Sequence, residues 1–291
     1  MQDELELRLR KHVTALAGRI GERNVGRPGT LAAAAQYIRT EWQAQGHAVS
    51  TQHCYTMGTE PCDNLEVAVA GAAPARGCIV VGAHYDTVPG SPGADDNASG
   101  VAALIEIARL LAGSRPARQV RLVAFVNEEP PFFLSGRMGS RIYARAARAR
   151  GEVIDFMISL EMLGCYSERP ASQAYPPLLR FFYPDRGNFI AFVSNLVSRG
   201  ALRRLVGAFR SECDFPCEAL AAPAIVPGIA WSDQLSFWRE GYRALMVTDT
   251  AFYRYPHYHS AHDTPDRLDY RAMARVVGGL AKALSVIPDG V

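Results

Sequence analysis

Strand-length apolar runs alternate with helical segments through the middle and end of the chain. The clearest runs cover residues 78–82, 120–126, 155–160 and 244–248, and they are apolar at nearly every position. A sheet with one face open to water would instead show alternating apolar and polar residues, so these runs predict strands that helices bury on both faces. The expected fold class is α/β, a single three-layer domain with a mostly parallel central sheet and helices on both faces.

Apolar residues recur at helical spacing in the segments between and beside these strands. Helices are expected over residues 3–22, 29–46, 101–112, 137–150, 188–210 and 266–287, with further strands over 47–51 and 64–69. Residues 166–187, rich in Pro, Arg and Tyr, are predicted to cross the surface beside the site. Without a repeat or an interdomain linker, residues 1–291 are expected to form one domain, with residues 1–46 as N-terminal helices packed on it.

Composition excludes several classes of function. The 31 Lys and Arg against 29 Asp and Glu give a net charge of +2, which creates no overall field toward nucleic acid or an anionic membrane. No apolar stretch reaches the roughly 18 residues that a membrane span requires, and the N-terminus lacks the apolar region of a secretory signal. We therefore expect a cytoplasmic protein with no nucleic-acid partner and no membrane span, whose oligomeric state the sequence leaves open. The six cysteines are expected to be free thiols, with short-loop disulfides between Cys54 and Cys62 and between Cys213 and Cys217 as the alternative for an exported protein.

Metal-binding residue types follow each of the four apolar runs. His84 and Asp86 follow the first run, Glu128 and Glu129 the second, Glu161 the third and Asp249 the fourth. Ligands of open α/β sheets bind beyond the carboxyl ends of the strands, so these side chains should meet at one edge. Imidazole and carboxylate without thiolate suit Zn²⁺, with Co²⁺ or Mn²⁺ as alternatives. Such a set is sufficient for two ions that share a bridge, an arrangement suited to amide hydrolysis.

Four segments resemble the signatures of the M28 zinc peptidases. They are HYDTVPGSPGADDNASGVAALIEIARLL, FVNEEPPFF, SLEMLG and PHYHSAHDTPDRLDY, and the resemblance extends from about residue 60 to the C-terminus. The resemblance implies a zinc-peptidase/phosphorylase-like fold. It also implies that His84 and Glu161 bind one zinc ion and Glu129 and His259 the other, with Asp96 bridging both.

The same resemblance implies that Glu128 is the general base. A carboxylate beside the ligands can take a proton from a metal-activated water and later donate it to the leaving amine. Asp86 can accept the second ring N–H of His84 and so fix its tautomer. Tyr258 either contacts the substrate carbonyl or packs as an aromatic side chain.

Several residues have competing interpretations. Asp95 either caps the helix that follows or joins the site. His257 and His262 compete with His259 for the second imidazole position, and His259 matches the family motif. Asp233 and Asp249 are candidates for support of the ligands, with structural hydrogen bonding as the default.

One departure from the family bears on the number of metal ions. The position of Glu161 is usually Asp in the best-known M28 members, and the longer side chain leaves a one-zinc site as an alternative to two. The leading functional hypothesis is a zinc-dependent exopeptidase that hydrolyses N-terminal peptide or aminoacyl amide bonds. A glutaminyl-cyclase-like mononuclear zinc aminoacyltransferase is the alternative. A non-catalytic binding domain of the same fold is disfavoured by the full ligand set.

Overall fold

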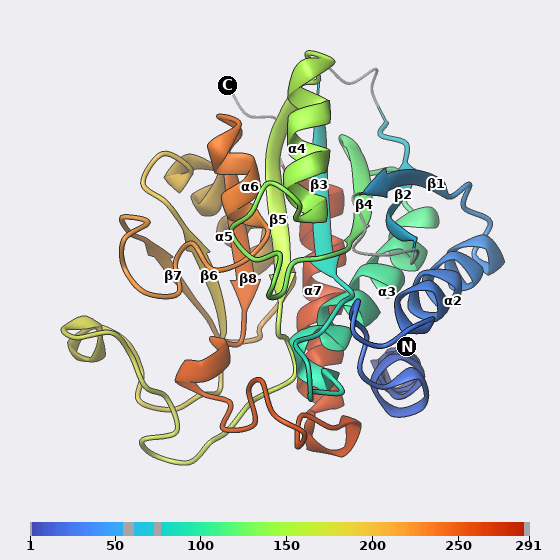
Figure 1. Cartoon of the computed structure of the whole chain (residues 1–291). Coiled ribbons are helices and arrows are strands. Elements are labelled where there is room, and N and C mark those ends of the chain that lie inside the picture. Colours follow the sequence, from blue (N-terminus) through green and yellow to red (C-terminus); the bar gives the residue numbers. More distant parts are fainter. Residues whose placement is uncertain (1, 55–60, 73–76, 288–291) are drawn as a thin grey trace.

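The computed structural model describes residues 2–54, 61–72 and 77–287. Within these ranges, eight strands form one mixed sheet in the order β1-β2-β4-β3-β5-β8-β6-β7 (Figure 1). The strands are β1 (Ser50–Cys54), β2 (Cys62–Val69), β3 (Cys78–His84), β4 (Gln119–Phe125), β5 (Ile154–Glu161), β6 (Ile190–Ser194), β7 (Cys217–Ala221) and β8 (Ala244–Thr248). The central strands β4, β3, β5 and β8 are parallel, whereas β2 and β6 run antiparallel to them.

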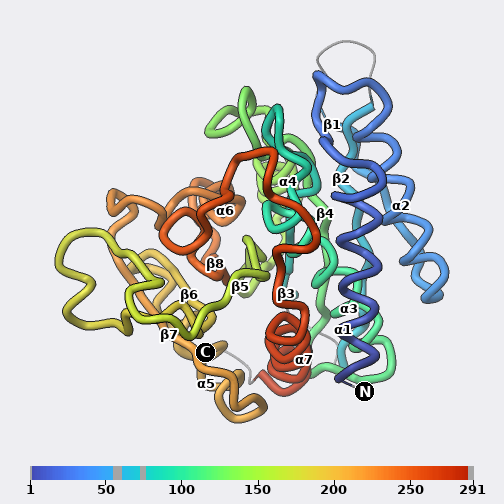
Figure 2. Tube along the Cα trace, turned by 90° about the horizontal axis from the view of Figure 1, so that it is seen from below, coloured from blue at the N-terminus to red at the C-terminus, as the bar shows by residue number. Residues whose placement is uncertain are grey.

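Helices cover both faces of this sheet (Figure 2). One face packs against α1 (Gln2–Val13), α2 (Thr30–Ala44), α3 (Gly100–Ala112), α5 (Arg199–Glu212) and α7 (Tyr270–Val286). The other packs against α4 (Gly139–Ala149) and α6 (Gln234–Arg239). A π-helical segment spans Thr14–Ile20, and a kinked segment with non-helical backbone at Asp96 and Asn97 spans Ala94–Ser99. 3₁₀ turns span Leu179–Phe181, Ala251–Tyr253 and Pro265–Arg267. The predicted three-layer α/β class with a mostly parallel sheet is confirmed.

The apolar pattern explains where the core forms. Every residue of β3 is buried, as expected for a central strand covered on both faces. Gly82 within β3 is required by packing, because a Cβ atom there would lie 2.2 Å from the ring of Phe125. Most of α3 is also buried, since it lies between the sheet and the helices α1, α2 and α7. The carboxyl-terminal ends of the central strands are therefore buried and held by the core of the molecule.

Two predicted elements differ from the structure. The helix predicted over 188–210 is wrong at its start, because Ile190–Ser194 forms β6 and α5 begins only at Arg199. All five β6 residues are buried between β8 and β7, and periodicity cannot distinguish so short an apolar run from a helix. The first strand lies at Ser50–Cys54 rather than 47–51, and the sequence pattern did not predict β7 or α6.

Two further features agree with the expectations from composition. None of the six cysteines forms a disulfide. In the part of the chain that the structure describes, no helix is both long and apolar enough to cross a bilayer.

Candidate metal centre

The four central strands direct polar side chains to one edge of the sheet. His84 is the last residue of β3 and Glu161 the last residue of β5. Glu128 and Glu129 follow β4 after a short connection. These strands are parallel, so their carboxyl ends lie side by side at the lower edge in Figure 1.

Two further side chains reach this edge from segments outside the sheet. Asp96 lies at a kink in the segment Ala94–Ser99 that leads into α3, where its backbone is not helical, and His259 lies in the loop before α7. The structure thus brings together all five predicted metal ligands and the predicted base, Glu128.

The ligand atoms form two groups that share Asp96. In one group, His84 Nε2 lies 3.3 Å from Asp96 Oδ1 and 3.5 Å from Glu161 Oε2. In the other, His259 Nε2 lies 3.1 Å from Asp96 Oδ2 and 3.4 Å from Glu129 Oε1. The two oxygens of one carboxylate therefore face two different imidazoles. A further, overlapping group joins His84 with Glu128 and Glu129.

Asp86 fixes the positions of residues on two strands. Its carboxylate oxygens accept the backbone N–H groups of Glu128 and Glu129, at 3.1 and 3.0 Å. Its Oδ1 also lies 3.5 Å from His84 Nδ1, and its backbone oxygen lies 3.2 Å from the same ring nitrogen. A neighbour that accepts this ring proton leaves Nε2 free to bind a metal. Asp86 therefore acts on the site through other residues.

Two supporting residues were not predicted from the sequence. The carboxylate of Asp263 accepts the N–H groups of Asp95 and Asp96, at 2.8 and 3.1 Å, and so holds the segment that presents Asp96. The hydroxyl of Ser232 donates to Glu161 Oε2 at 2.6 Å. Asp263 lies within the PHYHSAHDTPD motif, which could have suggested it. Ser232 has no comparable local signal.

Among the described residues, Asp95 neither caps a helix with its side chain nor joins a ligand group. Its Oδ1 accepts the N–H of Gly164 at 2.8 Å, in the segment after β5. Burial raises the pKa of Asp95 well above its usual value, and the charges of Asp249 and Asp263 add to the effect. Asp249 accepts the N–H groups of Cys165 and Ala251, so both aspartates order the loops around the site.

The remaining aromatic and histidine candidates lie beside the ligand groups or outside them. Tyr258 stacks on the ring of His259, with 3.7 Å between the ring centroids, which supports the packing interpretation of this tyrosine. The rings of His257 and His262 lie 6.0 Å apart, and neither residue belongs to a ligand group in the described part of the chain.

The electrostatics of this cluster favour a bound cation. Burial raises the pKa of Glu128 well above its usual value, and that of Glu129 to about 7. Burial disfavours charged imidazoles, yet the surrounding carboxylates raise the pKa of His259 to about 10 and that of His84 well above its normal value. Buried carboxylates in such number require compensating positive charge. The nitrogen and oxygen donors suit a divalent ion such as Zn²⁺.

Comparison with known proteins identifies the family. The family described as Peptidase family M28 matches residues 64–284. The chain belongs to this family. Over 286 residues, this M28 chain is 41% identical to the uncharacterized protein YfbL of Escherichia coli (strain K12), across 95% of this chain and 86% of YfbL.

Solved structures of other proteins have the same fold as this M28 chain. BSAP, a zinc aminopeptidase from Bacillus subtilis, is 14% identical with a TM-score of 0.71, covering 96% of this chain and 94% of that one. A glutaminyl cyclase from Bacteroides thetaiotaomicron is 18% identical with a TM-score of 0.68, covering 98% of both chains. At these identities the likeness concerns the fold alone. The M28 fold and the buried His, Asp and Glu groups together indicate a metal-binding site.

Proposed function

We propose that this M28 chain is a zinc-dependent aminopeptidase that removes the N-terminal residue from peptides or aminoacyl amides. The observation that supports this most strongly is the pair of ligand groups that share the Asp96 carboxylate. His84 and Glu161 would hold one ion and Glu129 and His259 the other, with Asp96 between them. Zinc at this site would polarise the scissile carbonyl and make water a stronger nucleophile at neutral pH.

Glu128 is placed to move the proton in this reaction. Its Oε2 lies 4.0 Å from His84 Nε2, and it belongs to neither group that contains Asp96. Because Asp86 holds the Glu128 backbone, the carboxylate stays beside the reaction space. Glu128 would take a proton from the attacking water and donate it to the leaving amine.

The free α-amine of the substrate supplies the specificity for chain ends. Carboxylate oxygens that the metal ions leave free at this end of the sheet would accept hydrogen bonds from a substrate ammonium group. A blocked, uncharged N-terminus would lose this interaction. This difference separates an aminopeptidase from an endopeptidase that uses the same metal chemistry.

The proposal is tested with zinc-loaded protein and paired substrates. Leucine, methionine and alanine anilides are compared with the same compounds carrying an N-acetyl group. We expect cleavage of the free amines to exceed that of the blocked compounds by about a hundredfold in kcat/KM, the scale of a lost buried charge interaction. Equal cleavage of both sets would contradict aminopeptidase action.

One observation favours glutaminyl-cyclase activity as the alternative function. A glutaminyl cyclase shares the fold over 98% of both chains. A peptide with N-terminal glutamine distinguishes the two reactions by mass. Cyclisation releases ammonia and leaves the peptide bond intact, whereas hydrolysis releases free glutamine. We expect free glutamine, because the His84 group with Asp96 and Glu161 is complete in addition to the His259 group.

A further inference from the structure

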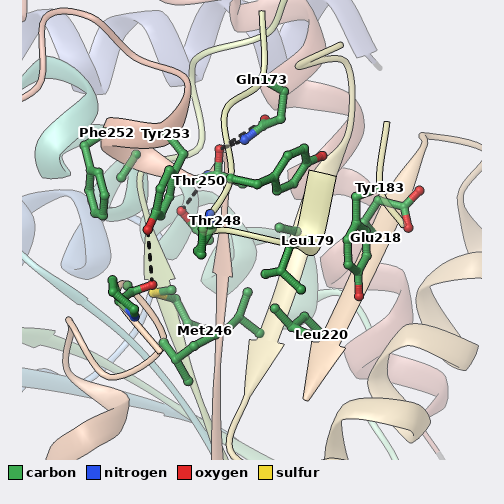
Figure 3. Close-up of a pocket in the computed structure, with 18 of the residues that line it drawn as sticks. Gln173, Leu179, Tyr183, Glu218, Leu220, Met246, Thr248, Thr250, Phe252 and Tyr253 are labelled. Atoms are coloured by element: carbon green, nitrogen blue, oxygen red, sulfur yellow. Dashed lines mark hydrogen bonds between the residues drawn. The ribbon is translucent and has the colours of Figure 1, made fainter. Parts of the chain in front are cut away.

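An apolar pocket opens beside the metal centre (Figure 3). Glu161 and Tyr258 line it at the end next to the ligand groups, while the segment that contains Tyr175, Leu179 and Tyr183 lines the far end. In Figure 3, Phe252 and Tyr253 lie on one side of the pocket, and Tyr183 and Glu218 lie on the opposite side. Glu218 is thus an acidic side chain in a pocket that is otherwise mostly apolar.

Strand register places Glu161 and Glu218 at the two ends of one row. Glu161 pairs with Thr248 across β5 and β8, and Thr248 pairs with Ala191 across β8 and β6. Ala191 in turn pairs with Glu218 across β6 and β7. Paired residues on neighbouring strands project to the same face, so all four side chains face the pocket. Three strand spacings separate the two glutamate Cα atoms by about 14 Å.

The carboxylate of Glu218 has no partner among the described residues. It makes no hydrogen bond or ion pair there, although the side chain is partly buried. The nearby Tyr175 and Tyr183 hydroxyls donate instead to the backbone oxygens of Pro184 and Ala219, at 2.6 and 3.0 Å.

The one cation whose charge acts on Glu218 is already engaged elsewhere. In the described part of the chain, Arg210 lowers the pKa of Glu218, although burial raises it overall. The Arg210 guanidinium donates to the sulfur and the backbone oxygen of Cys217, at 3.3 and 3.0 Å. Cys217 packs into the core on one face of β7, whereas Glu218 lines the pocket on the other face. Because Arg210 binds Cys217, the Glu218 carboxylate stays available to a ligand in the pocket.

Aromatic rings beside Glu218 complete a surface suited to a cation. Tyr175 and Tyr183 stack with 5.9 Å between their ring centroids. Rings of this kind attract lysine and arginine cations. The same pocket is lined by Leu179, Leu220 and Met246, which would contact the aliphatic part of a lysine or arginine side chain whose cation reaches Glu218.

We propose that this pocket binds the side chain of the substrate's N-terminal residue, and that Glu218 selects lysine or arginine by pairing with the cation. This inference rests on the proposed aminopeptidase function. The separation of Glu161 and Glu218 is long enough for a bound lysine or arginine substrate. Its scissile carbonyl would lie at the metal centre, its aliphatic side chain would cross the pocket, and its cation would pair with Glu218. A leucine side chain is too short to reach Glu218 and gains nothing from it.

The test compares lysine and arginine anilides with norleucine and leucine anilides, using zinc-loaded protein. Norleucine has the unbranched stem of lysine without its ammonium group. We expect wild-type kcat/KM for lysine to exceed that for norleucine by about ten- to a hundredfold, as charge-assisted hydrogen bonds allow. Glu218→Gln should abolish this preference, so that lysine and norleucine anilides are cleaved with similar kcat/KM.

Two controls accompany this variant. Glu212→Gln removes one negative charge near the end of α5, outside the pocket, and should keep the lysine preference. Glu218→Asp keeps the charge and should retain part of the preference, which a misfolded pocket would not.

The outcomes separate the inference from the proposed function. Faster cleavage of norleucine than of lysine by the wild type would overturn the role of Glu218 and leave the aminopeptidase proposal intact. An undiminished lysine preference in Glu218→Gln would do the same. Failure to cleave any free-amine substrate would refute the proposed function, and the inference with it.

Discussion

Replacing Glu128 with glutamine is expected to lower kcat by about 10²- to 10⁴-fold, the usual contribution of a general base, while zinc content stays unchanged. The backbone N–H of Glu128 is held by Asp86 at 3.1 Å, so glutamine should keep the position of the native side chain. It would lack the carboxylate that accepts the proton. Steady-state kinetics and metal analysis of the same preparation measure both effects.

The neighbouring residue provides the matched control. Glu129 Oε1 lies 3.4 Å from His259 Nε2 within a group that contains Asp96, so Glu129→Gln should lower zinc content as well as activity. Full activity in Glu128→Gln would refute its role as base. Loss of zinc in that variant would instead make Glu128 a ligand.

Replacing Asp96 with asparagine is expected to impair both metal binding and catalysis. Both ligand groups contain this carboxylate, and each of its oxygens faces a different imidazole. Metal-ion catalysis contributes several kcal/mol of transition-state stabilisation, so its loss should lower kcat/KM by about a thousandfold or more. Both ligand groups should lose zinc together, so the zinc content of the protein should fall for both ions.

Asp95→Asn is the control for this prediction. Asp95 is adjacent in sequence and equally buried, but its side chain accepts the N–H of Gly164 and belongs to no ligand group in the described chain. This variant should keep its zinc. If Asp96→Asn retained full zinc content and activity, the shared position of Asp96 between two ions would be incorrect.

The strand-end residues could be predicted from sequence because local pattern and sheet geometry act together. Continuous apolar runs predict parallel central strands, and parallel strands bring His84, Glu129 and Glu161 to one edge. His259 was predicted by its motif alone, since no strand presents it. Its position depends on how the loop before α7 folds back over the sheet.

The supporting contacts could not be predicted because they join distant parts of the chain. Arg23 is fully buried and donates to the backbone oxygens of Tyr85, Pro92 and Gly93, at 2.8, 2.7 and 3.0 Å. It thereby fixes the loop between β3 and the segment of Asp96 to the N-terminal region. An arginine in this position gives no local signal of burial, because that class of residue is usually exposed.

Glu161 decides between the one-zinc and two-zinc alternatives. Its longer side chain still places Oε2 at 3.5 Å from His84 Nε2, and the Ser232 hydroxyl holds the same oxygen at 2.6 Å. The extra methylene is therefore accommodated within the His84 group. This geometry is compatible with the proposed second ion beside the one that Glu129 and His259 would hold.

The most direct measurement is the zinc-to-protein ratio of the wild type, determined by plasma mass spectrometry after zinc loading and removal of unbound metal. Two ligand groups that share Asp96 predict two zinc ions per chain. A ratio of one, unchanged at higher zinc concentration, would contradict the shared two-metal centre.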